Sequence, residues 1–246
     1  MKKNILLAGI ILAVIFSACK KKGEFYKTDT ISDFVPLEVG KYITYQLDSL
    51  IYADNINPVD RVKSYQVKHL VEDTTTDNLG RKAYTIRRYI RKTADDAWVT
   101  DNAFVAINTG NSLEFIENNF RFIKLKEPIK NNYTWKGNSY IDTDPVNTQL
   151  NYLEDWDYTY DSLNTPLHLG TITVDSTLKV AERDEIQGNP DDPTSIISIV
   201  NFSVSNYGRG IGLVYHRFVH REYQNPTGTV GYVVGYGITL TMIDHN

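Results

Sequence analysis

Apolar and polar side chains alternate along much of this 246-residue chain from Phe34 onward, and this period of two constrains its fold more than any other feature. Successive side chains of a strand point to opposite faces, so the alternation predicts strands with one buried face. Four groups of residues each share one parity: Tyr65, Val67, His69 and Val71; Tyr84, Ile86 and Ile90; Ile196, Val200, Phe202 and Val204; and Tyr232, Val234, Tyr236, Ile238, Leu240 and Met242.

The segments between these runs are rich in turn residues. Asp77–Gly80, Thr109–Asn111 and Asn225–Gly228 supply residues that tolerate a positive φ, which favours tight connections between antiparallel strands. Two prolines and a glycine in 188–193 predict a loop there. This spacing predicts about ten to twelve antiparallel strands.

Helix signals are scarce. The best is Asp144 as an N-cap before Pro145, followed by Val146, Leu150 and Leu153 at helical spacing. We therefore expect an all-β fold, a large curved antiparallel sheet with at most one or two short helices. A half-barrel, an open barrel and a sandwich all fit the pattern.

The N-terminus reads as an export signal that ends at a cysteine. Lys2 and Lys3 precede an unbroken apolar run, and small residues lead to Cys19. The apolar run is shorter than the about 20 residues that a membrane span requires. Residues 1–18 are therefore predicted to be a lipoprotein signal peptide, and Cys19 is predicted to be the lipidated residue that anchors the chain to a membrane.

The rest of the chain is expected to form one domain. Residues 19–32 are polar and without periodicity, which predicts a lipidated tether, and residues 33–246 are long enough for a single β domain. Cys19 is the only cysteine, so the domain contains no disulfide and must depend on its core for stability.

Charge argues against a nucleic-acid partner. Five of the 26 basic residues are Lys2, Lys3, Lys20, Lys21 and Lys22, which leaves 26 − 5 = 21 basic residues against 30 acidic residues. The body therefore has a formal charge of 21 − 30 = −9, which disfavours contact with phosphate backbones.

Four segments resemble a family of Bacteroidota lipoproteins of unknown function: Phe34–Tyr42 with Tyr45, Glu117–Leu125, Trp135–Tyr140 and Gly210–Tyr215. The resemblance implies an envelope location and an all-β domain, and it implies no catalytic residues. In that phylum an acidic stretch after the lipidated cysteine marks lipoproteins for the cell surface, whereas Lys20–Lys22 are basic. By this resemblance we expect an outer-membrane anchor that faces the periplasm, with the lysines against anionic head groups.

The sequence contains no motif that predicts catalysis. A Gly-x-Ser-x-Gly elbow, a phosphate-binding glycine loop and a His-Glu-x-x-His zinc helix are all absent from it. His216 and His220 lie in a segment with strand-forming residues, where positions i and i+4 stand about 13 Å apart and cannot bind one ion. We expect no catalytic residue, no metal and no cofactor.

Trp156, Asp155, Asp157 and Tyr158 are the candidate ligand-binding residues. A ring that stacks on a sugar beside carboxylates that accept hydroxyl hydrogen bonds is typical of a glycan site. A simpler interpretation is a strand with one polar face, formed by Asp155, Asp157 and Asp161.

The 17 tyrosines, against three tryptophans, fit either sheet packing or a half-wet ligand face. We expect a non-catalytic lipoprotein whose curved sheet binds an apolar ligand or another envelope protein, with a concave apolar surface free of converging titratable groups. The alternative is a glycan-binding module or an envelope hydrolase.

Overall fold

The computed structural model describes residues 28–52, 60–144, 150–190, 192, 195–225 and 231–246. The predicted signal peptide, Cys19 and the basic segment lie outside the described residues. So do Pro145 and Val146 of the predicted helix, and most of the predicted turn at Asn225–Gly228.

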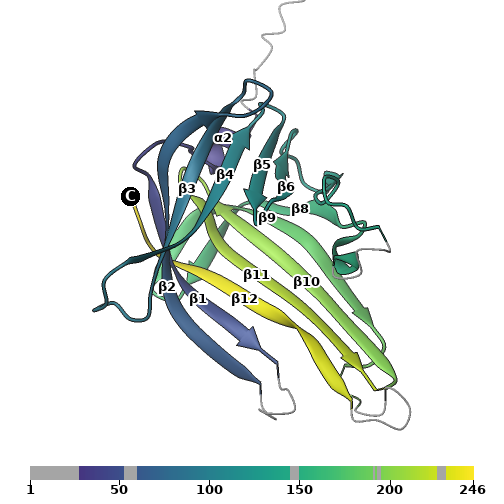
Figure 1. Cartoon of the computed structure of the whole chain (residues 1–246). Helices are drawn as coiled ribbons and strands as arrows, with labels where there is room; N and C mark the ends of the chain where they lie inside the picture. The colour runs from purple at the N-terminus through teal and green to yellow at the C-terminus, as the bar shows by residue number, and fades with distance from the viewer. Residues whose placement is uncertain (1–27, 53–59, 145–149, 191, 193–194, 226–230) are drawn as a thin grey trace, which may run out of the picture.

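Twelve strands form a single antiparallel sheet that is nearly closed into a barrel (Figure 1). Each strand pairs with the next along the chain, β1 also pairs with β12, and the only break in this circular order lies between β6 and β7. The predicted all-β fold and the predicted strand number are confirmed. The strands are β1 (Tyr42–Ile51), β2 (Arg61–Thr76), β3 (Lys82–Arg91), β4 (Val99–Asn108), β5 (Ser112–Glu117), β6 (Phe120–Lys126), β7 (Thr134–Lys136), β8 (Asp157–Leu169), β9 (Ile172–Gln187), β10 (Ile197–Gly208), β11 (Gly212–Gln224) and β12 (Tyr232–His245).

The two edges of the sheet, β6 and β7, meet at a seam made of a few hydrogen bonds. The amide of Ile123 donates to the carbonyl of Gly137 at 2.8 Å, and the indole Nε1 of Trp135 donates to the carbonyl of Ile123 at 2.8 Å. Nearby, the hydroxyl of Tyr160 accepts from the amide of Lys126 and donates to its carbonyl, at 2.8 Å each. These bonds occupy edge groups that would otherwise be open to another chain.

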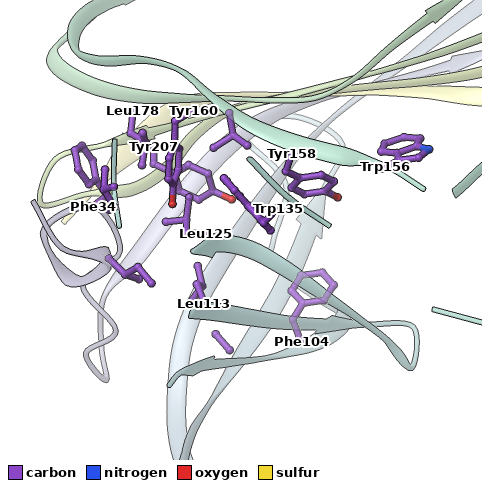
Figure 2. Packing of buried hydrophobic residues seen from close by; sticks show 14 of the residues in the cluster. Phe34, Phe104, Leu113, Leu125, Trp135, Trp156, Tyr158, Tyr160, Leu178 and Tyr207 are labelled. Atoms are coloured by element: carbon purple, nitrogen blue, oxygen red, sulfur yellow. The ribbon is translucent and has the colours of Figure 1, made fainter. Parts of the chain in front are cut away.

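Aromatic rings on the inner side of the seam form the centre of the core. Figure 2 shows the buried cluster extending from Phe34 at one end to Trp156 at the other, with Phe104 and Leu113 opposite. Trp135 lies 4.6 Å from Tyr160 and 5.8 Å from Tyr158, measured between ring centroids. Large buried rings contribute both area and specific edge or offset contacts, so the seam coincides with the densest packing.

A short helix, α2 (Ile31–Phe34), packs against one end of the sheet. Asp33 accepts hydrogen bonds from the backbone amide and hydroxyl of Thr30, and the amide of Ile31 donates to Glu127 at 2.9 Å. Ile31 and Phe34 are almost completely buried. The folded part therefore begins before the expected boundary at residue 33, because Ile31 belongs to the core.

Within the predicted helix from Asp144 to Leu153, the structure describes only a 3-10 turn, η1 (Asn151–Leu153), among the residues it describes there, and this turn buries Leu153. In the described part of the chain, no helix has the length and apolar character needed to cross a membrane.

On β10 the face that lines the interior is not the apolar face that the alternation predicts to be buried. Val200 and Phe202 lie on the outer side, where the guanidinium of Arg217 stacks over Phe202 at 5.3 Å. The opposite parity, with Ser203 and Ser205, turns inward and is buried. Alternation identifies two faces of a strand, but it does not decide which face is enclosed when a buried carboxylate needs hydroxyl partners.

Gly137 supplies a direct test of packing at the seam. A Cβ at this position would overlap the ring of Tyr158, which is held in place by a 3.0 Å hydrogen bond from its hydroxyl to Asn138. We expect Gly137→Ala to lower the free energy of unfolding by about 1–3 kcal/mol, as overpacking does elsewhere. Urea denaturation measures the change.

Thr134→Val, on the exposed side of β7, is the matched control and should change the free energy of unfolding by less than about 0.5 kcal/mol. Equal stability of Gly137→Ala and wild type would contradict this packing.

Candidate functional site

The interior of the sheet contains two adjoining cavities. The first, here called the apolar cavity, has a volume of about 300 Å³. It is lined chiefly by apolar side chains from many strands, among them Val71, Ile86, Phe104, Leu213 and Leu240. The second, here called the aromatic cavity, has a volume of about 380 Å³ and is lined by rings that include Phe120, Tyr152, Trp156, Phe218 and Tyr236.

The two cavities share one wall. Five side chains border both of them, and this set is called the shared wall: Arg88, Glu117, Lys124, His216 and Ile238. Four of the five are titratable, and they come from β3, β5, β6 and β11. The expectation of a concave surface free of converging titratable groups is therefore wrong.

Behind the shared wall, Glu182 on β9 is the best-satisfied buried carboxylate of the site. Ser203 and Ser205 donate their hydroxyl hydrogens to its two oxygens, at 2.5 and 2.7 Å. Lys124 forms an ion pair with it at 3.6 Å between Nζ and Oε1. Burial raises the pKa of Glu182, but Lys124 and the two serines outweigh this effect and hold the pKa below its usual value.

Glu117 is in a different position. Its carboxyl has no hydrogen bond or ion pair among the described residues, although it borders both cavities. Burial raises its pKa, and the charges of Lys124 and Arg88 offset only part of that rise. Glu117 is thus a partly buried carboxyl with unused hydrogen-bonding capacity.

The two cations of the shared wall also have unused donors. Arg88 donates through Nε to Asp101, while its Nη nitrogens make no hydrogen bond to the described residues. Lys124 lies 4.8 Å from the ring of Phe122 and 5.5 Å from that of Tyr158, and among the described residues its one ion pair is the long contact with Glu182. Both side chains can therefore donate to a molecule in either cavity.

His69 adds a buried atom without a partner. Its ring lies in the wall of the apolar cavity, between Tyr45 and Phe104, at 5.0 and 5.2 Å from their centroids. Its Nε2 atom is buried and has no hydrogen-bond partner in the described structure. Burial, reinforced by the charge of Arg88, lowers the pKa of His69 to about 3, so the imidazole is neutral at pH 7.

Ser205, His216 and Glu182 contain the residue types of a hydrolytic triad, but their hydrogen bonds are arranged differently. Ser205 donates to Glu182, so at its 3.0 Å contact with Nδ1 of His216 the serine oxygen is the acceptor. A nucleophilic serine needs the reverse direction, with its proton directed at the histidine. Burial also lowers the pKa of His216 to about 4. This arrangement favours a buried polar network that fixes side chains.

The predicted glycan-binding residues do not form the expected arrangement. Trp156 and Tyr158 are 2% and 1% exposed and belong to the core, and their rings border the aromatic cavity. Asp155 and Asp157 lie on the outside, where both form ion pairs with Lys136. The exposed ring beside two carboxylates is therefore absent at these residues. The simpler interpretation, a strand with one polar face, holds for Asp157 and Asp161 on β8, whereas Asp155 lies in the turn before that strand, with a φ of 56°.

His216 and His220 both lie on β11, as the sequence predicts, and they contact different groups. His216 contacts Ser205, whereas His220 contacts Asn201 at 2.7 Å and stacks on Tyr152 with 4.0 Å between ring centroids. Within the described residues, no group of three or more His, Cys, Asp or Glu side chains is placed to hold a metal ion.

Sequence patterns did not point to the charged residues of the shared wall or to Glu182 behind it. Glu117, Lys124 and Glu182 each occupy an ordinary polar position in an alternating segment, and nothing in the local pattern separates an inward charge from an outward one. The inward serines at 203 and 205 offered one signal, since two hydroxyls at i and i+2 can serve a single buried acceptor.

Comparison of this chain with protein-family models, with curated proteins and with solved structures finds no match in any of the three. The resemblance to envelope lipoproteins stays a prediction.

The two buried neutral histidines predict loss of stability in mild acid. In the unfolded chain an imidazole binds a proton near pH 6.5, whereas His69 and His216 bind one only near pH 3 and 4 in the folded state. Between these values the unfolded state holds more protons, so the stability contribution is present above pH 6.5 and is lost as the pH falls. By pH 5 each histidine should have removed about 2 kcal/mol from the free energy of unfolding.

Urea denaturation at pH 7 and pH 5, on wild type and His69→Phe, measures this effect. The variant should lose about 2 kcal/mol less between the two pH values than wild type does. Glu117 contributes equally to both proteins, so the comparison between them removes its effect. Its raised pKa makes the folded state hold more protons than the unfolded state, so its contribution to stability increases as the pH falls. The same pH dependence in both proteins would show that His69 accepts a proton in the folded state.

Proposed function

We propose that this chain is a lipid-anchored protein of the bacterial envelope that binds a small, largely apolar molecule inside its sheet and performs no catalysis. The anchor is the acylated Cys19, and the domain faces the periplasm. The observation that carries the proposal is the apolar cavity on the inner side of the sheet, bordered by Val71, Ile86 and Phe104.

Its size supports a small-molecule ligand. Ligand pockets commonly have volumes of about 300–1,000 Å³ with mostly apolar linings and a few polar groups. The apolar cavity, at about 300 Å³, adjoins the aromatic cavity of about 380 Å³. Four titratable side chains lie together at the shared wall, and the rest of the lining is mainly apolar with a few polar side chains, among them Lys41, Ser49 and His69. This distribution suits a ligand with an apolar body.

The hydrogen-bond directions support binding without catalysis. Ser205 gives its proton to Glu182 and not to His216, so neither serine nor histidine is set up for nucleophilic attack. The charge of the domain supports a partner other than nucleic acid.

Filling the apolar cavity should abolish binding of an apolar ligand. Leu47 borders this cavity from β1, and Leu47→Trp places an indole ring in it. We expect wild type, expressed as residues 20–246, to bind the neutral fluorophore N-phenyl-1-naphthylamine in a saturable manner. The variant should bind it at least ~tenfold more weakly, which corresponds to a loss of about 1.4 kcal/mol of binding free energy. Residues 20–246 contain every described contact of the fold.

The matched control is Val62→Trp, which adds the same ring on the exposed outer side of β2 and should leave the affinity unchanged. Circular dichroism and urea denaturation verify that both variants are folded. Equal affinity in wild type and a folded Leu47→Trp would place the fluorophore outside the apolar cavity and contradict the proposal.

A further inference from the structure

The polar groups of the shared wall have hydrogen-bonding capacity that no described residue uses. Arg88 has free Nη donors, and Lys124 has free Nζ donors beside its 3.6 Å ion pair. Glu117 has a carboxyl without a hydrogen bond. Desolvated polar groups without partners are costly, so these three side chains favour a ligand that supplies both a donor and an acceptor.

The charges next to the two cavities are already paired. Arg88 forms an ion pair with Asp101 and Lys124 forms one with Glu182, while burial raises the pKa of Glu117 and so disfavours its charged form. An anionic head group would add a negative charge beside Glu117 and Glu182, and a cationic head group would add a third positive charge beside Arg88 and Lys124. Either would leave an unpaired charge among partly buried side chains.

The apolar cavity extends from this wall toward α2. Val35 and Leu37, which follow that helix, also border the apolar cavity, as does Lys41, whose ammonium donates to the backbone carbonyl of Asn246 at 3.1 Å. A chain or ring system that starts at the shared wall therefore has an apolar path in this direction.

We propose that the ligand is an uncharged amphipath with a hydroxyl-bearing head, which donates to Glu117 and accepts from Arg88 or Lys124, while its hydrocarbon part occupies the apolar cavity. This inference rests on the proposed binding function, and it names the class of ligand. A hydroxyl group is matched to the wall because it adds no charge and is both a donor and an acceptor.

Three ligands with the same hydrocarbon chain and different heads test the proposal. 1-Decanol, decanoate and decylammonium are each titrated at pH 7.5 against residues 20–246 loaded with N-phenyl-1-naphthylamine. We expect 1-decanol to displace the fluorophore at a concentration at least ~tenfold lower than either charged compound, because only the alcohol satisfies the wall without adding charge.

Variants at Glu117 show whether the wall recognises the head group. Glu117→Leu removes the acceptor and should lower the affinity for 1-decanol at least ~fivefold, while the fluorophore still binds. The amide of Glu117→Gln offers a donor and an acceptor, so the affinity of this variant for 1-decanol should stay within about threefold of that of wild type. Should Glu117→Leu fail to fold, the comparison of the three heads on wild type and Glu117→Gln still tests the proposal. Glu72→Leu, the same change on the exposed outer side of β2, is the matched control and should leave the affinity for 1-decanol unchanged.

The outcomes separate this inference from the function on which it rests. Stronger displacement by decanoate or decylammonium, or equal displacement by all three, would overturn the hydroxyl-bearing head and leave an apolar binding site in place. Failure of wild type to bind the fluorophore or any decyl compound would overturn both.

Discussion

The seam between β6 and β7 is the contact on which the interior of this protein depends. Without it a twelve-stranded sheet would be an open surface with two free edges. Only a few hydrogen bonds cross it, so the packing of Trp135 against Tyr158 and Tyr160 must supply much of its stability. Because the seam is closed, the side chains on the inner face line two partly open cavities instead of an exposed concave sheet.

Enclosure also explains why the polar groups of the shared wall are significant. On an open sheet Glu117, Lys124 and Arg88 would be solvated and unremarkable, whereas inside a nearly closed sheet each carries a desolvation cost. Glu182 offsets that cost with two serine hydrogen bonds and Lys124, while Glu117 and the Nε2 atom of His69 do not. Groups left without partners in a well-packed protein are candidates for ligand contact, and here they border a cavity of suitable size.

Much of the fold could be predicted from the sequence, since alternation follows directly from the pleat of a strand. The site could not, because alternation shows that a strand has two faces without showing which is enclosed. On β10 the apolar parity of Val200 and Phe202 lies outside, and the serines lie inside because Glu182 needs them. Trp156 beside two aspartates resembled a surface site, yet its ring is in the core and the carboxylates are outside. The position of Glu117 depends on pairing across β4, β5 and β6, which no local pattern encodes.

Native mass spectrometry of residues 20–246, exported into a bacterial envelope behind a cleavable secretory signal, tests the central claim most directly. A cavity that holds an uncharged amphipath predicts one additional mass per protein, and organic extraction should release a hydroxyl-bearing, largely hydrocarbon compound. The same preparation of Leu47→Trp, in which the apolar cavity is filled, should lack this mass. A wild-type mass equal to that of the polypeptide alone, or an adduct retained undiminished in Leu47→Trp, would contradict the claim that this cavity is the binding site.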